Sequence, residues 1–338
     1  MDNNSTRVRI LGLKRLPLTT ERLLSQLPKM RAFVTHLDEL PQLTAPLEQL
    51  VFLRLRSIPE CDLTAAISML PALRVLHITN YGSRRLHLGR ANALEVLTIG
   101  SWRGRELQDI SSLSNLRQLR FLYCEDLMCL PSDIGLLTRL RHFELDFTSF
   151  LMVLPAGICS LTALRQLVLS RCNALQRLPS GIGRLENLVS LGLAGCGRLE
   201  ELPAGISSLS SLRKLNLAEC NRLVVLPESI SCLQNLQHIW MRKCWSITGL
   251  PDTIGGLMNL QTLDLAESKN LSALPESIGD LCSLRVLDLC RCSSIAEVPS
   301  SVSKLTSLQL LNLSLCDGLV HERVPQSVFN MPHLTCHI

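Results

Sequence analysis

A proline preceded by leucine or valine returns at a constant interval through the middle of this chain. The aliphatic residues between these pairs keep the same spacing, and consecutive units follow the template LPxxIxxLxxLxxLxLxxCxxLxx. A sequence period of roughly 20–50 residues indicates a solenoid, in which each unit buries its apolar face only against its neighbours. We therefore expect stacked coils and no single central core. The pairs begin at Leu130, Leu154, Leu178, Leu202, Leu226, Leu250, Leu274 and Val298.

Two leucines separated by one residue mark the strand of each unit. Alternation along a strand sends both leucines to one face and the residue between them to the other. Because every coil returns in the same direction, the strands are expected to form a parallel sheet. The proline of each pair has a fixed φ and no N–H, which suits entry into a short helix or 3₁₀ turn on the convex side. The predicted fold is an α/β solenoid with a concave parallel β-sheet and short convex helices or 3₁₀ turns.

Glycines beside the template isoleucine are interpreted as turn residues and not as part of a phosphate-binding loop, because neither GxGxxG nor GxxxxGK[ST] occurs. The sequence of the expected convex turns therefore contains no nucleotide-binding motif. These glycines are Gly135, Gly157, Gly181, Gly205, Gly255 and Gly279.

The period is loose near the N-terminus and fixed further along. Strand-like segments lie at residues 8–11, 33–35, 53–55, 76–78, 97–99 and 119–121. From Phe33 onward these segments are unevenly spaced, and after Leu119 the spacing settles at the length of the template. Loose spacing at one end is typical of terminal repeats adapted to capping. We expect a divergent cap over residues 1–45 and one continuous solenoid over 46–338, with regular repeats over 106–320.

Composition and motifs exclude several classes of function. The formal net charge is +5, with 15 Lys/Arg against 8 Asp/Glu in residues 1–105, which is a mildly basic third and no nucleic-acid surface. No apolar run approaches 18 residues, so no membrane span is expected, and the polar N-terminus lacks a secretory apolar segment. HExxH and GxSxG are absent, and the histidines lack metal-ligand spacing. The predictions are no enzyme, no cofactor and no metal.

Cysteine recurs three residues after the second strand leucine. Thr148 and Ser268 hold the same position in two other units, and all three residue types carry one donor hydrogen on a short stem. We interpret them as a ladder of side-chain donors to buried carbonyls. Disulfides or zinc are the alternative, but cysteines stacked in register have parallel Cα–Cβ vectors that suit neither. A ladder of reduced thiols predicts a cytoplasmic protein. Its cysteines are Cys124, Cys172, Cys196, Cys220, Cys244, Cys292 and Cys316.

The template, with cysteine where many such repeats have asparagine, resembles the leucine-rich repeats of plant nucleotide-binding disease-resistance receptors. It is also similar to plant intracellular Ras-group-related leucine-rich repeat proteins. The resemblance covers residues 106–320 well and 46–105 loosely. It implies a horseshoe-shaped recognition or autoinhibitory domain. No nucleotide-binding domain accompanies the repeats, so we expect a stand-alone repeat protein or a receptor relative without its switch.

The concave face offers one region that stands out from an ordinary solvated surface. Ser190, Gly192, Ala194 and Gly195 give a nearly bare strip, with aromatic and charged side chains on the coils to either side. A low floor between such walls suits docking, and Trp, Tyr and Arg are common interface anchors. The alternative is that scattered exposed aromatics are normal. The predicted partner-binding residues are Tyr123, Phe147, Arg171, Gly192, His238, Trp240, Arg242, Lys243, Asp264, Glu267 and Asp288.

We therefore predict a non-enzymatic module that binds a protein or peptide on its concave face, in plant-type immune signalling inside the cell. A scaffold for small GTPase or phosphatase signalling, or a small-ligand sensor in the same groove, is the alternative. The open sheet favours a protein, since small ligands need enclosed pockets.

The C-terminal end is expected to be uncapped. The pair Val324-Pro325 comes later than the template spacing requires, and the chain stops near the next strand. Leu311, Leu313, Val328 and Leu334 have no later repeat to cover them, so this end is predicted to self-associate, dock on a partner or belong to a longer chain.

Overall fold

The computed structural model describes residues 10–13, 32–36, 46–58, 60, 63–88, 91–105, 107 and 109–338. The chain divides into two compact units, Met1–Thr148 and Ser149–Ile338. The predicted cap over residues 1–45 lies mostly outside the described residues. The expected single domain over 46–338 stays a prediction, and the two units are described one at a time.

The first unit is built from parallel strands that pair in chain order. Of the strand expected at residues 8–11, residues 10 and 11 lie in a strand, and residues 8 and 9 lie outside the described residues. Its helical elements are α2 (Leu63–Ser68), η1 (Ile110–Ser112) and η2 (Ser132–Leu136). Its strands are β1 (Ile10–Leu13), β2 (Ala32–His36), β3 (Phe52–Arg56), β4 (Val75–Thr79), β5 (Val96–Gly100), β6 (Gln118–Leu122) and β7 (His142–Asp146).

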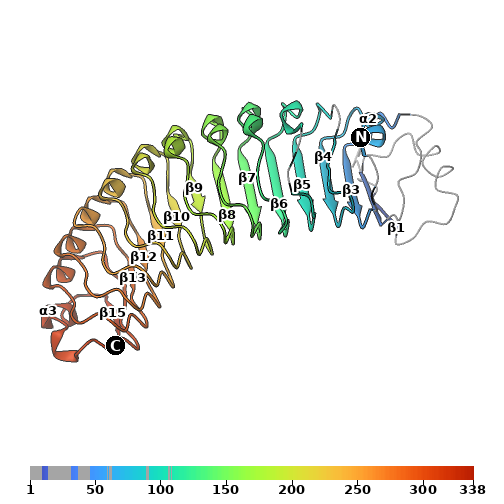
Figure 1. The fold of residues 1–338 in the computed structure, drawn as a ribbon. Coiled ribbons are helices and arrows are strands. Elements are labelled where there is room, and N and C mark those ends of the chain that lie inside the picture. The colour runs from blue at the N-terminus through green and yellow to red at the C-terminus, as the bar shows by residue number, and fades with distance from the viewer. Residues whose placement is uncertain are drawn as a thin grey trace, which may run out of the picture. The chain divides into compact units, whose positions relative to one another are not determined.

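The second unit repeats one coil with little variation, from green to red in Figure 1. Strand residues pair with their counterparts one template length along the chain, as in Lys214↔His238, and only the last pairing, Leu310↔Thr335, is offset by one more position. Its strands are β8 (Gln166–Ser170), β9 (Ser190–Gly192), β10 (Lys214–Asn216), β11 (His238–Trp240), β12 (Thr262–Asp264), β13 (Val286–Asp288), β14 (Leu310–Asn312) and β15 (Thr335–His337). Its helical elements are η3 (Ala156–Ser160), η4 (Ser180–Arg184), η5 (Ala204–Ser208), η6 (Glu228–Cys232), η7 (Ile254–Gly256), η8 (Glu276–Asp280), η9 (Ser300–Lys304), η10 (His321–Arg323) and α3 (Gln326–Phe329).

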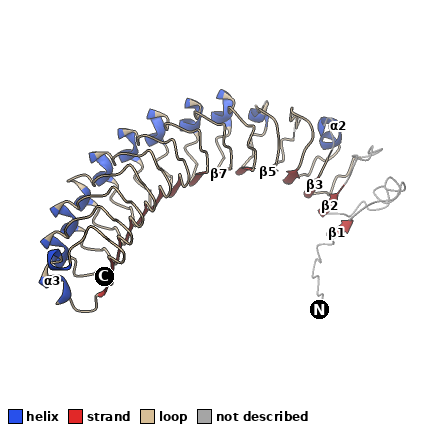
Figure 2. Ribbon diagram, turned by 60° about the horizontal axis from the view of Figure 1, so that its bottom comes forward, coloured by secondary structure: helices blue, strands red, loops and turns tan. Residues whose placement is uncertain are grey.

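Strands and helices lie on opposite sides of the coils. Figure 2 shows this clearly in the second unit, where the strands (red) line one face and the short helices (blue) the other. Leu215 and Leu217 of one coil are fully buried between the two layers, as are their counterparts in neighbouring coils. Each such leucine contributes roughly 1.5–3 kcal/mol of apolar burial. The predicted α/β solenoid with a parallel sheet is confirmed.

The convex turns begin as the sequence predicts, but their glycines act in another way. Prolines such as Pro227 and Pro275 directly precede a 3₁₀ turn with extended ψ. The nearby glycines do not have positive φ, which among the described glycines is found only at Gly195. A Cβ added at Gly255 would lie 2.4 Å from the carbonyl oxygen of Ser277 in the next coil. Gly205, Gly255 and Gly279 are therefore needed because adjacent convex turns approach closely there.

The last coil corrects the expectation for the C-terminal end. Leu311, Leu313 and Val328 are buried, and only Leu334 stays half-buried. The expectation was wrong because the segment after Val324 completes one more coil, in which α3 packs against η9 and β15 pairs with β14. The self-association expected of this end stays a prediction.

Candidate recognition surface

The residues between the strand leucines form a column in register on the sheet face of each unit. All of them are half-exposed except Thr98, which is buried. The first unit aligns Arg54, His77, Thr98, Arg120 and Glu144. The second aligns Val168, Gly192, Asn216, Trp240, Asp264, Asp288 and Asn312.

A second column was not anticipated from the sequence. In each regular coil the residue directly before the cysteine, threonine or serine of the ladder position has positive φ. This conformation costs an L-residue about 1–2 kcal/mol, and it is fixed here by a backbone bond to the following coil, such as Lys243 N–H to Ala266 O at 2.8 Å. Only one residue of this column, Gly195, is a glycine, so the sequence did not indicate that these positions have positive φ. The column comprises Tyr123, Phe147, Arg171, Gly195, Glu219, Lys243, Glu267, Arg291 and Leu315.

Aromatic side chains form one stacked pair in each unit. Tyr123 and Phe147 of the first unit have ring centroids 4.9 Å apart and planes inclined by 18°. Tyr123 is 54% exposed. In the second unit His238 stacks on Trp240 with centroids 5.3 Å apart and planes inclined by 13°. Each pair therefore places two stacked, at least half-exposed rings on the face where partner binding is predicted.

Charged residues around Trp240 neutralise one another. Arg242 Nε donates to Glu267 Oε1 at 3.1 Å, and Lys243 Nζ lies 3.9 Å from Glu219 Oε1. The hydrogen bond from Arg242 is the main cause of the lowered pKa of Glu267. The Lys243–Glu219 pair is partly exposed on both sides, so it is weak and free to exchange with a partner's charges. The Glu267 side chain is only 15% exposed, so its pair with Arg242 is held more firmly.

The two aspartates predicted as partner contacts already have structural bonds. Asp264 Oδ1 accepts from the backbone N–H of Ala266 at 3.0 Å, and Asp288 Oδ1 accepts from Cys290 N–H at 2.9 Å. Asn216 repeats the contact in its own coil. Burial is the main cause of the raised pKa of Asp264. The recurring Asn/Asp at this position therefore forms an Asx-type turn with the backbone two residues on, a role that the predicted partner contacts did not include.

The strip of small side chains expected over residues 190–195 is narrower than predicted. Gly192 has only ordinary contacts, the nearest to Val168. At Gly195, however, an added Cβ would lie 2.9 Å from Cγ of Arg171, so the arginine side chain covers this glycine. Arg171 therefore forms part of the floor. Tyr123 and Phe147 belong to the first unit and the rest of the predicted set to the second, so a groove that joins them stays a prediction.

The cysteines of the ladder position donate to backbone carbonyls. In the second unit Cys196, Cys220 and Cys244 reach carbonyl oxygens of the preceding coil at 3.0, 3.3 and 3.1 Å. Ser268, Cys292 and Cys316 do the same at 3.0, 3.2 and 3.0 Å. Cys124 bonds to Ile99 O at 3.5 Å, and Cys172 lies 3.9 Å from Ser170 O.

Burial keeps the ladder thiols protonated. It raises the pKa of Cys124 to about 11 and the pKa of Cys244 and of Cys292 to about 12. Every cysteine that the structure describes is a free thiol. Over the same residues, no cluster of three or more His, Cys, Asp or Glu could hold a metal ion. The described helices include none that is long and apolar enough to cross a membrane.

Comparison with known proteins agrees with this architecture. A family model described as a leucine-rich repeat region matches residues 229–313, and one described as a leucine-rich repeat matches residues 211–233. A search of curated proteins finds no match. The chain therefore contains a leucine-rich repeat domain.

Solved structures share the fold at low sequence identity. One is the Toll–Spätzle complex of Drosophila, with a TM-score of 0.61 and 19% identity over 90% of this chain and 50% of the other. Another is an internalin of Listeria monocytogenes, with a TM-score of 0.52 and 17% identity over 93% of this chain and 88% of the other. At these identities the likeness establishes the fold alone.

Proposed function

We propose that this protein is a non-enzymatic recognition module that binds a protein or peptide on the sheet face of its repeats. One observation carries the proposal. Trp240 stands half-exposed in the middle of the second unit's column, stacked on His238 and next to the Arg242–Glu267 ion pair. Aromatic residues beside arginine are the usual energetic centres of protein interfaces.

The open form of this surface favours a macromolecular partner over a small ligand. Neighbouring coils present one half-exposed residue each, and the side chains beside them are paired at the surface. A small molecule generally needs an enclosed cavity that covers most of its surface. An extended or flat partner can instead contact several coils at once.

The cellular setting is part of the same proposal. The free, buried thiols of the ladder fit a reducing compartment, which supports a cytoplasmic location. The resemblance of the repeat template to plant disease-resistance receptors supports a role in immune signalling. The Toll–Spätzle complex, which shares the fold, is a hub in Drosophila development and innate immunity.

The test is a comparison of two tryptophans in one coil. Trp245 is 47% exposed but lies outside the strand, five residues after Trp240. The wild-type chain, Trp240→Ala and Trp245→Ala are used to retain proteins from plant extract, followed by mass spectrometry. The proposal expects a protein that is retained by wild type and by Trp245→Ala and lost by Trp240→Ala. Equal retention by all three variants would contradict it.

A further inference from the structure

A buried hydroxyl in the first unit lacks a partner. Thr98 is only 7% exposed, and its Oγ1 has no hydrogen-bond partner among the described residues. Leu97 and Ile99 on either side of it point into the core, so Thr98 points to the sheet face. Buried polar groups without a partner are rare in native proteins and call for an explanation. A ligand atom on this face would supply one.

The neighbours of Thr98 in the sheet are basic. His77 and Arg120 are its register partners on the adjacent strands, and Arg54 is the partner of His77 one strand further. No acidic residue interrupts this column from Arg54 to Arg120. Burial, followed by the charges of Arg54 and Arg120, lowers the pKa of His77. The column therefore carries a positive potential where Thr98 offers its hydroxyl.

The same column has one cation engaged and one without an ion pair. Arg120 Nε lies 3.0 Å from Glu144 Oε2, and that carboxylate also contacts His142 at 3.1 Å. Arg54 has no ion pair within the described part of the chain, and its buried Nε lacks a hydrogen-bond partner there. The acidic residue of this column, Glu144, thus lies at the β7 end. At the opposite end the charge of Arg54 is available to a ligand.

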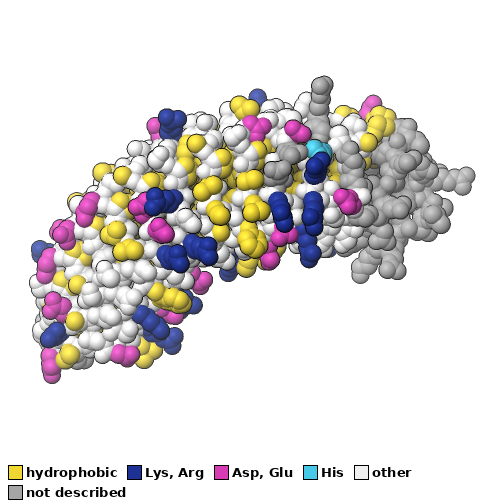
Figure 3. All heavy atoms as spheres, in the orientation of Figure 1, with side chains coloured by type: hydrophobic (Ala, Val, Ile, Leu, Met, Phe, Trp, Pro, Cys, Tyr) yellow, Lys and Arg dark blue, Asp and Glu magenta, His cyan; other side chains and the backbone are white. Residues whose placement is uncertain are grey.

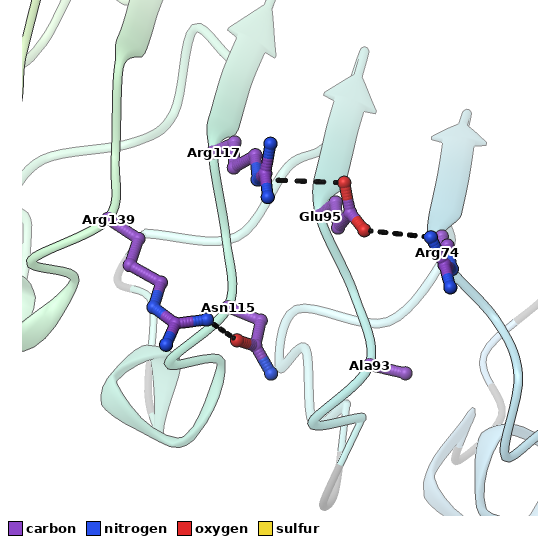
Figure 4. A pocket seen from close by; sticks show the side chains of 6 residues that line it. All are labelled: Arg74, Ala93, Glu95, Asn115, Arg117 and Arg139. Atoms are coloured by element: carbon purple, nitrogen blue, oxygen red, sulfur yellow. Dashed lines mark hydrogen bonds and ion pairs between the residues drawn. The ribbon is translucent and has the colours of Figure 1, made fainter.

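A basic pocket lies where the same strands begin. Its cavity is about 230 Å³, and Arg74, Arg117 and Arg139 line it together with Glu95, Asn115 and Ala93. Figure 4 shows Arg74 and Arg117 on either side of Glu95, with Arg139 directed at Asn115. These side chains come from the segments that lead into β4, β5, β6 and β7. In Figure 3, Lys and Arg side chains (dark blue) gather over this part of the first unit.

The existing ion pairs show which anion this surface accepts. Carboxylates of Glu95 and Glu144 already meet three of the arginines, at 3.3, 3.6 and 3.0 Å. Arg74 and Arg117 are each more than half exposed, so water screens their pairs and exchange with an incoming carboxylate is easy. Coils about 4.8 Å apart repeat these donors across the sheet, which suits an extended chain with several charges.

We propose that this basic face, made of Arg54, Thr98, Arg120, Arg74, Arg117 and Arg139, binds an extended Asp/Glu-rich segment of a protein partner. One carboxylate accepts the Thr98 hydroxyl between Arg54 and Arg120, and further carboxylates occupy the arginine pocket. This inference rests on the proposed function. It adds the chemistry of one segment of the partner protein that the repeats bind. The carboxylates already paired with Arg74, Arg117 and Arg120 favour a carboxylate-bearing segment over a nucleic acid.

The experiment uses the full chain and a fluorescent peptide rich in glutamate, with its glutamine counterpart as the neutral probe. Anisotropy titrations give Kd for each, and inorganic phosphate and a single-stranded RNA are added as competitors. The expected result is binding of the glutamate peptide alone, weakened at high salt, with little competition from either phosphate source. Displacement by RNA or phosphate at lower charge concentration than by unlabelled glutamate peptide would overturn the proposal.

Two variants and a matched control locate the site. Thr98→Val keeps the shape and removes the unpartnered hydroxyl, so it should weaken peptide binding about tenfold without lowering the melting temperature. Arg74→Gln with Arg117→Gln and Arg139→Gln should weaken it further. Arg213→Gln with Arg285→Gln changes exposed arginines at the equivalent template position of the second unit and should have no effect.

Unchanged Kd in Thr98→Val, or equal losses in the control pair, would overturn the inference. The results also distinguish failure of this inference from failure of the proposed function. A chain that ignores glutamate peptides but retains a protein in a Trp240-dependent way would refute only the acidic partner segment. Binding of the glutamate peptide without any Trp240-dependent partner would refute the role of the second unit instead.

Discussion

The two units differ in the side chain that directly follows the positive-φ residue of each coil. In the early coils of the first unit it holds the large side chains of Ile58, Tyr81 and Trp102, all buried. In the second unit it holds a thiol or a hydroxyl that donates to the preceding coil. Trp102 combines both roles, because its fully buried ring donates from Nε1 to Ser83 O at 2.8 Å.

This difference accompanies a change in spacing, because the fixed period begins at Leu119 and the first ladder cysteine is Cys124. From Cys196 to Cys316 the donor and its carbonyl are 27 residues apart wherever the donor reaches the preceding coil. In the first unit the separation for Cys124 and Ile99 is 25 residues. Bulky side chains tolerate such variation because they fill space without a fixed bond length. Regular spacing and the repeated hydrogen bond thus occur together in the later coils.

The largest expected effect is the loss of the bulky filler in the first unit. Trp102→Ala removes a fully buried ring and leaves Ser83 O without its donor, which should destabilise by about 3–5 kcal/mol. Denaturant unfolding followed by hydrogen exchange should locate the loss in residues of the first unit. Trp245→Ala, at an exposed site, is the control and should change stability by less than about 1 kcal/mol. Equal losses in both variants would refute the packing role.

A smaller effect is expected where the convex turns touch. Gly255→Ala forces a methyl group against Ser277 O and should cost about 1–3 kcal/mol. Gly249→Ala is the matched control, because no atom lies within 4 Å of its added Cβ. Thermal unfolding of the pair measures the difference. If both variants melt together, the glycines are not required for close approach.

Two substitutions of the same ladder cysteine should differ in their effect on stability. Cys220→Ser keeps a donor to Leu193 O and should be tolerated, whereas Cys220→Val leaves that buried carbonyl without it and should cost about 1–3 kcal/mol. Cys196 is expected to behave in the same way. A valine variant as stable as the serine variant would show that the position needs only volume.

Exposed and ladder thiols should also differ in reactivity. Cys129, Cys232 and Cys282 are exposed, whereas burial raises the pKa of Cys244 to about 12. In the native protein at about pH 8, below the ordinary thiol pKa, these three exposed thiols should be alkylated much faster than the buried ladder thiols. Since the folded-state pKa of the ladder thiols is raised, their contribution to stability should be full at neutral pH and decline above about pH 9, as the unfolded thiols ionise. Rapid alkylation of Cys244 in the native protein would argue against a buried donor.

The sequence predicted the fold because the period fixes the position of every buried leucine. The ladder position was also recognisable, since Cys, Thr and Ser share only a donor hydrogen. It was missed in the early coils, where Ile58, Tyr81 and Trp102 share no chemistry with cysteine. The left-handed column had no signature because backbone bonds between coils impose it on residues as different as Phe147 and Lys243.

The candidate sites depended on contacts that spacing does not reveal. The half-exposed Trp240 followed from strand alternation alone. By contrast, the covering of Gly195 by Arg171 depends on one side-chain conformation. The unpartnered hydroxyl of Thr98 also required knowledge of what its neighbours do, since threonine is a common residue in strands.

The recognition role is tested most directly by the affinity of the retained partner for a double variant. Trp240→Ala with Arg242→Ala removes two solvent-facing side chains, so the free energy of unfolding should stay within about 1 kcal/mol of wild type. The account predicts that Kd for the purified partner rises at least about tenfold, or about 1.4 kcal/mol, while Trp245→Ala binds as wild type does. An unchanged Kd in the folded double variant would contradict binding at this face.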